Sequence, residues 1–73
     1  MAQKIRWAAE EVVTVDKRKL RCYARPSRSE IIVRVENDGD TTKYAEWGMP
    51  KLMGIGPAIL QAAFQTKPED IRA

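Results

Sequence analysis

The sequence contains no histidine and a single cysteine, Cys22, among its 73 residues. Zinc, iron and copper sites are usually built from His and Cys ligands, so we expect no such metal and no cofactor. One cysteine cannot form an internal disulfide, which excludes the small folds stapled by disulfide bonds. Without a histidine to activate it, Cys22 is also a poor candidate for a nucleophile. These shortages indicate that the protein is not an enzyme.

Long apolar runs are also absent. The longest stretches, such as 58–60 and 62–64, are far shorter than the ~20 residues needed to cross a bilayer. Residues 1–7 carry charge, but no apolar run of the kind found in secretory signals follows them. We therefore expect a protein of the reducing cytoplasm that does not contact membranes.

The length of the chain limits what it can build. Residues 1–73 are enough for a single domain, and a hydrophobic share of 44% argues against general disorder. A chain of this size buries only about 60% of the surface that its unfolded form exposes, so a large interior pocket would consume its core. The expected product is a small monomeric domain that works by binding.

Alternation of apolar and polar residues predicts an antiparallel sheet. β-branched residues indicate a strand near 10–16, and clear period-two alternation predicts strands over 19–25 and 30–37. The turn sequence Asn37-Asp38-Gly39-Asp40 suits a tight hairpin, which makes 41–47 the return strand. Residues 1–9 are ambiguous between a short strand and a helical turn.

A helix is predicted near the C-terminus. Pro57 suits the start of a helix, and Ile59, Leu60, Ala63 and Phe64 form an apolar stripe at helical spacing. We expect this helix to span about 57–66 and its stripe to cover the inner face of the sheet. A further helical turn or a frayed end is expected after residue 67. The predicted fold class is α+β, a small antiparallel meander of three to four strands with a C-terminal helix.

A basic cluster lies in the middle of the chain. Six Lys and Arg residues fall between Asp16 and Glu30, with no acid among them. In a strand over 19–25, two arginines flank a tyrosine on the solvent face and the remaining bases lie toward the two ends. This arrangement predicts a continuous basic docking surface, although charges that protect a sheet edge are the alternative. The predicted partner-binding residues are Lys17, Arg18, Lys19, Arg21, Tyr23, Arg25 and Arg28.

The acids follow a different distribution, which bears on the class of partner. Some gather around the predicted hairpin turn at 37–40 and others bracket the first strand, so we expect a dipolar domain. Nucleic-acid-binding modules usually carry a larger positive excess than the +3 found here. The balance favours a protein partner, and direct DNA or RNA binding by the same basic surface is the alternative.

Other conspicuous residues have structural interpretations. Trp7, Tyr44 and Trp47 could form a stacking platform, but a domain this small needs its largest side chains in the core, where we expect both tryptophans. Cys22 falls on the apolar face of its strand and is expected to be a buried structural thiol. The glycines at 54 and 56 lack the neighbours of a phosphate-binding loop and indicate a connector before the helix.

In length, single-domain character, lack of histidine and separated charge, the chain resembles the small regulators that bacteriophages encode to bind host machinery. It is similar in size to the RNA-polymerase-binding transcription regulators known from a Xanthomonas phage. That resemblance implies a protein that binds bacterial RNA polymerase, inhibits transcription initiation and promotes antitermination through protein contacts, without catalysis. Anti-CRISPR proteins are equally small, so the target stays open, and no shared motif assigns a role to any residue.

Overall fold

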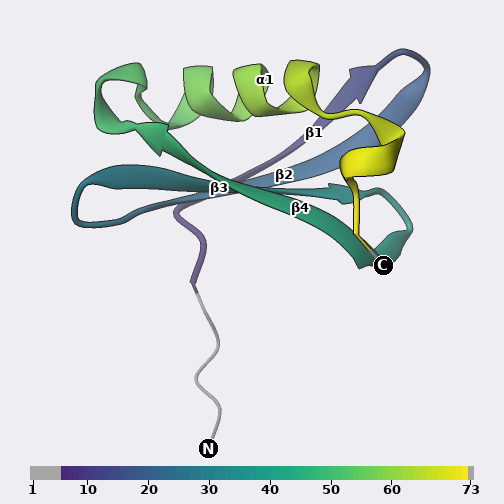
Figure 1. The fold of residues 1–73 in the computed structure, drawn as a ribbon, viewed down its shortest axis with the longest axis horizontal. Helices are drawn as coiled ribbons and strands as arrows, with labels where there is room; N and C mark the ends of the chain where they lie inside the picture. The colour runs from purple at the N-terminus through teal and green to yellow at the C-terminus, as the bar shows by residue number, and fades with distance from the viewer. Residues whose placement is uncertain (1–5, 73) are drawn as a thin grey trace, which may run out of the picture.

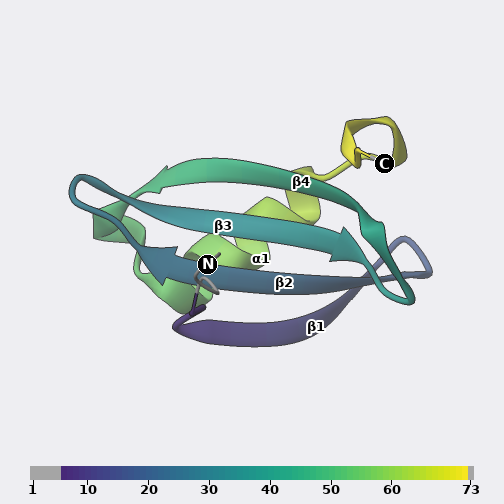
Figure 2. The ribbon, with the colours of Figure 1, turned by 90° about the horizontal axis from the view of Figure 1, so that it is seen from below.

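Four antiparallel strands and one α-helix make up the fold (Figure 1). The computed structural model describes residues 6–72. Each strand pairs with the next along the chain, so the order in the sheet is β1-β2-β3-β4 (Figure 2), and this meander with a C-terminal helix confirms the predicted α+β class. The elements are β1 (Ala9–Val15), β2 (Arg18–Pro26), β3 (Glu30–Asn37), β4 (Asp40–Pro50), the 3₁₀ turn η1 (Lys51–Met53), α1 (Ile55–Gln65) and the 3₁₀ turn η2 (Pro68–Asp70).

Two tight turns connect β1 to β2 and β3 to β4. Asp38 and Gly39 connect β3 to β4, and Gly39 has a φ of 85°, a left-handed conformation that glycine adopts without a steric penalty. Asp16 and Lys17 connect β1 to β2 with φ values of 50° and 65°, as the two central residues of a type I′ hairpin loop require. The pairing of β1 with β2 continues in register from its turn, whereas the pairing of β3 with β4 shifts between Asn37 and Glu36, so that Glu36 lies opposite Tyr44.

The helix covers one face of the sheet and closes the core between them (Figure 1). Small side chains on its inner side, Ala58, Ala62 and Ala63, allow the helix backbone to approach β1, β2 and β3 closely. The larger buried residues come mainly from alternate positions of the strands. The core comprises Val15, Leu20, Cys22, Ala24, Ile31, Val33, Val35, Met49, Ala58, Ile59, Ala62 and Ala63.

The expected apolar stripe of the helix is only half correct. Ile59 and Ala63 are buried, but Leu60 is 45% exposed and Phe64 is 72% exposed. The buried side of α1 is instead completed by Ala58 and residue 62, which leaves Leu60 and Phe64, four residues apart, together on the outer side. The sequence pattern predicted that the apolar residues of the helix would all face the sheet. In the structure the alanines and Ile59 face the sheet, and the larger Leu60 and Phe64 face outward.

The two ends of the chain differ in how they are held. The part of the ambiguous segment before Arg6 lies outside the described residues, and Arg6 to Ala8 form neither strand nor helix. At the other end, η2 follows Lys67, and Arg72 then pairs with Tyr44 at the edge of β4. Within residues 6–72, no helix combines the length and the apolar character that crossing a bilayer requires. The side of the sheet that faces away from α1 carries no helix (Figure 2).

Leu20 provides a test of where the stability resides. Its side chain is fully buried between the sheet and α1, so Leu20→Ala should lower the free energy of unfolding by ~2–5 kcal/mol. Leu52→Ala is the matched control, because Leu52 is fully exposed and should change stability by no more than ~0.5 kcal/mol. Urea denaturation followed by circular dichroism measures both values, and equal losses in the two variants would contradict the assigned core.

Cys22 provides a second test through pH. Burial, with a smaller effect from Glu11, raises the pKa of the thiol from 9.0 to about 11. The unfolded chain therefore ionises at Cys22 before the folded protein does, and the associated stability, present below pH 9, is lost as the pH rises toward 11. Between about pH 8 and about pH 10.5 the wild type should lose roughly 2 kcal/mol more than Cys22→Ala. Parallel urea titrations at about pH 8 and about pH 10.5 measure the difference, and identical losses would show that the thiol is accessible in the folded state.

Candidate binding site on the open sheet face

The face of the sheet opposite α1 is built from alternate residues of all four strands. On β2 these residues are Lys19, Arg21, Tyr23 and Arg25, and the register places residues of β1 and β3 directly beside them. Tyr23 lies between Glu10 and Arg34, and Arg21 lies between Val12 and Glu36. Directly paired residues project on the same side of an antiparallel sheet. The open face defined here comprises Glu10, Val12, Thr14, Lys19, Arg21, Tyr23, Arg25, Ile32, Arg34, Glu36, Tyr44 and Glu46.

Trp7 adds a second aromatic ring to this face. Its ring centroid lies 5.7 Å from that of Tyr23, with an angle of 42° between the planes, and the Arg25 guanidinium carbon lies 5.6 Å from the Trp7 ring. These contacts partly bury Tyr23, and that burial, followed by the nearby Glu36 and Glu10, raises the pKa of its phenol. Trp7 therefore lies outside the core, contrary to expectation, whereas Trp47 packs partly against the core on the helix side.

A second arginine–aromatic pair lies on β3 and β4. The guanidinium carbon of Arg34 lies 4.2 Å from the Tyr44 ring centroid, a distance typical of a cation–π contact. Arg34 Nε is 4.0 Å from Glu36 Oε1, too far for a hydrogen bond. Glu36 faces this side of the sheet, but it is only 5% exposed, and its paired neighbours Arg21 on β2 and Tyr44 on β4 lie on either side of it.

Three buried polar atoms on this face have no hydrogen-bond partner among the described residues: Arg25 Nε, Arg34 Nε and Glu36 Oε2. A buried polar atom left without a partner costs about 1–3 kcal/mol. The core between the sheet and α1 has no such side-chain atom within residues 6–72. The unsatisfied donors and acceptor therefore gather on the open face, on the arginines that contact Trp7 and Tyr44 and on the neighbouring Glu36.

Arg21, by contrast, already has its partners inside the protein. Its guanidinium donates to Glu10 Oε1 at 2.7 Å and to Asp38 Oδ1 at 3.2 Å, and these two carboxylates raise its pKa. Glu10 comes from β1 and Asp38 from the β3–β4 turn, both brought beside β2 by the strand register. The charge of Arg21 is thus paired with carboxylates of the protein itself and is not free to bind a partner's acid.

The predicted continuous basic surface does not form. Lys17 lies in the β1–β2 turn and Arg28 in the loop at the other end of β2, a strand of nine residues that spans about 30 Å. Arg18 projects to the helix side, where its guanidinium donates to the Thr66 carbonyl at 2.9 Å. Of the seven predicted partner-binding residues, only Lys19, Arg21, Tyr23 and Arg25 lie on the open face. The antiparallel register places acids of β1 and β3 beside these bases, so the expected separation of charge is also wrong on this face.

Sequence reasoning also missed members of the site. Arg34 and Tyr44 fall in the predicted strands over 30–37 and 41–47, but the sequence pattern does not link either residue to the bases of β2. Their outward positions were visible in the period-two pattern of 30–37 and 41–47, but the sequence contained no signal for which strand lies beside which. The pairing of β2 with β3 and of β3 with β4 brings them together.

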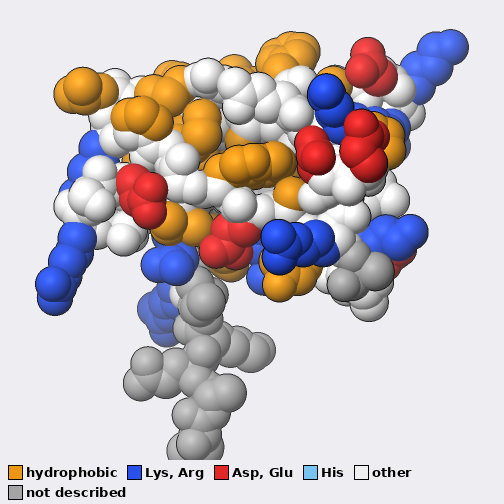
Figure 3. All heavy atoms as spheres, viewed as in Figure 1, with side chains coloured by type: hydrophobic (Ala, Val, Ile, Leu, Met, Phe, Trp, Pro, Cys, Tyr) orange, Lys and Arg blue, Asp and Glu red, His pale blue; other side chains and the backbone are white. Residues whose placement is uncertain are grey.

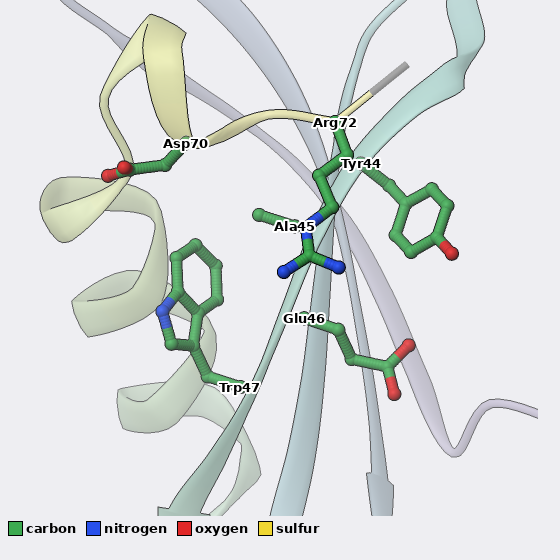
Figure 4. Close-up of a pocket in the computed structure, with 6 residues that line it drawn as sticks. All are labelled: Tyr44, Ala45, Glu46, Trp47, Asp70 and Arg72. Atoms are coloured by element: carbon green, nitrogen blue, oxygen red, sulfur yellow. The ribbon is translucent and has the colours of Figure 1, made fainter.

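A separate groove lies along the outer edge of β4 (Figure 4). Arg72 and Tyr44 form an isolated antiparallel β-bridge at this edge, with two backbone hydrogen bonds of 2.5 and 2.7 Å. The cavity beside it has a volume of about 350 Å³, and Glu46, Trp47 and Asp70 contribute to its walls. It is a shallow and mixed surface, and none of its side chains holds a buried polar atom without a partner among residues 6–72.

Residues 6–72 contain no group of three or more Cys, Asp or Glu side chains placed to hold a metal ion. Comparisons of the chain with protein-family models, with curated proteins and with solved structures find no match. The candidate site therefore rests on its own geometry.

The two tryptophans allow the open face to be tested directly, because they lie on opposite sides of the sheet. In a Trp47→Phe background, the emission reports Trp7 alone. Tyr23→Ala should then expose Trp7, shifting its emission to longer wavelength and raising its acrylamide quenching constant about twofold, since the ring loses its main aromatic neighbour. Leu52→Ala in the same background is the control. Unchanged Trp7 emission in the Tyr23 variant would contradict the stacked arrangement.

Proposed function

We propose that this chain is a small, non-catalytic regulatory protein that docks on a bacterial protein complex through the open face of its sheet. The observation that carries the proposal is the group of unsatisfied buried atoms of Arg25, Arg34 and Glu36, which lie beside the partly exposed aromatic side chains of the same face. Arginine and aromatic side chains supply most binding hot spots at protein interfaces. These atoms are covered in the isolated protein, so their side chains must turn toward a partner before they pair with it, and that pairing then recovers free energy that the isolated protein lacks.

The charge pattern favours a protein over a nucleic acid. Glu10, Glu36 and Glu46 lie among the arginines of the open face, so a phosphate backbone laid across it would meet carboxylates as well as cations. A protein surface with both signs of charge can match this alternation. Catalysis is disfavoured because the only thiol, Cys22, is buried and its raised pKa keeps it protonated near neutral pH.

Bacterial RNA polymerase is the partner that we propose, on the basis of the resemblance to phage-encoded regulators. In this proposal the protein acts in the host cytoplasm, inhibits initiation and promotes antitermination by occupying a surface of the polymerase. The open face supports the docking part of this proposal, and the resemblance alone supports the choice of polymerase.

Binding to purified bacterial RNA polymerase tests the proposal. Arg25→Glu should weaken binding at least tenfold, or ~1.4 kcal/mol, because it removes a hot-spot cation and reverses its charge at a site that is already partly buried. Lys67→Glu makes the same change in charge at an exposed position beyond α1 and should leave affinity within twofold. Fluorescence anisotropy of the labelled protein gives the affinities, and in vitro transcription with the same variants measures inhibition.

Two results would count against this assignment. Equal affinities of the wild type and Arg25→Glu would remove the open face from the interface, and no binding by the wild type would remove RNA polymerase as the partner. An oligonucleotide titrated over a range of salt concentrations separates the alternative. We expect no measurable binding near physiological salt, whereas affinity that falls steeply with salt would instead indicate phosphate contacts.

A further inference from the structure

The outer side of α1 is unusual in a chain of which 32% is charged. No residue from 52 to 66 carries a charge, and Lys51 and Lys67 flank this stretch. The helix therefore presents apolar and uncharged residues to the outside as well as to the core. Surface helices of globular proteins normally place charged residues on the face opposite the core.

The exposed part of this stretch forms one apolar stripe. Leu52 is fully exposed, and Leu60 and Phe64 follow at 45% and 72% exposure. Figure 3 shows hydrophobic side chains along the upper surface, over η1 and α1, with the charged side chains gathered toward the ends and below. The helical stripe, defined here as Leu52, Gly56, Pro57, Leu60 and Phe64, is separate from the open face, because the sheet lies between them.

We infer that the helical stripe is a dimerisation surface that binds the same stripe of a second copy of this chain. Gly56, Leu60 and Phe64 are spaced four residues apart and form one ridge of the helix. In a two-fold pairing with the helices antiparallel and crossing at Leu60, the Phe64 ring of each copy lies over Gly56 of its partner. Gly56 is suited to receive it, since a Cβ added at that position would meet no neighbouring atom within 4 Å.

Charge explains why a second copy is the occupant that fits. A two-fold interface sets each surface against itself, so every charge on it meets the same charge of the partner. Two molecules with a net charge of +3 repel each other, and the helical stripe is a surface over which no like charges are brought together. A membrane surface is the less suitable occupant, because helices that bind lipid surfaces carry Lys and Arg along their polar side and α1 has none.

The size of the stripe sets the expected affinity. A helix of 11 residues is about 16 Å long, and contact along one side of it buries less than the ~800 Å² per partner of a standard interface. We therefore expect a reversible dimer with a dissociation constant of about 0.1–1 mM. Pairing through α1 leaves both open faces on the outside of the dimer, pointing away from each other.

Sedimentation equilibrium from about 10 µM to about 2 mM, a range that brackets the expected dissociation constant, tests the inference. The mean mass of the wild type should rise from 8.3 kDa toward twice that value and no further. Leu60→Glu should raise the dissociation constant at least tenfold, because it sets two carboxylates together at the crossing point. Val12→Glu, at an equally exposed valine on the open face, is the control and should dimerise as the wild type does. Circular dichroism verifies that each variant is folded.

A mixing experiment tests the two-fold geometry. Leu60→Lys alone should also dimerise at least tenfold more weakly than the wild type, and an equimolar mixture of Leu60→Glu with Leu60→Lys should recover dimers, because opposite charges then meet. A wild type that stays at 8.3 kDa, a mass that passes the dimer, or no recovery on mixing would each overturn the inference. Co-sedimentation with vesicles of phosphatidylcholine and phosphatidylglycerol that Leu60→Glu abolishes would also overturn it, since lipid would then be the occupant.

Discussion

A four-stranded sheet has two faces, and residues 6–72 supply a single α-helix, which covers one of them. Burying one face in a domain of 73 residues uses α1 and its alanines, so the opposite face must remain in contact with solvent or with a partner. This difference between the two faces determines which strand residues form the core and which are available for binding. The apolar alternate positions of β2 and β3 form the core, and their polar alternate positions form the open face.

The open face is more than a solvated surface because of what the strand register brings together. Arg21 is neutralised by carboxylates from β1 and from the β3–β4 turn, whereas Arg25 and Arg34 lie against aromatic rings and keep buried nitrogens without partners among the described residues. The hydrogen bonds of Arg21 to carboxylates are made within the protein, whereas Arg25 and Arg34 each have a nitrogen that makes none among the described residues. A surface that combines internal charge pairs with unsatisfied buried groups is expected to be specific rather than generally adhesive, because only a matching partner satisfies those groups.

The helix has a similar division between its two sides. Its inner side is made of alanines and Ile59, which fit closely against the sheet, and its larger apolar residues Leu60 and Phe64 remain outside. The two surfaces proposed for binding, the open face and the helical stripe, are therefore on opposite sides of one small domain. A protein of this construction can contact a partner and a second copy at the same time without competition between the two surfaces.

The sequence by itself determined the strands, the tight turn at Gly39, the helix and the burial of Cys22, because periodicity and turn chemistry are local properties that neighbouring residues specify. The composition of the two surfaces proposed for binding was decided by the tertiary structure. A run of bases in the sequence suggested one continuous patch, but strand alternation sent Arg18 to the helix side and antiparallel pairing set Glu10 beside Arg21. Which charges meet depends on contacts between residues far apart in the chain, and the local pattern carries no information about those contacts.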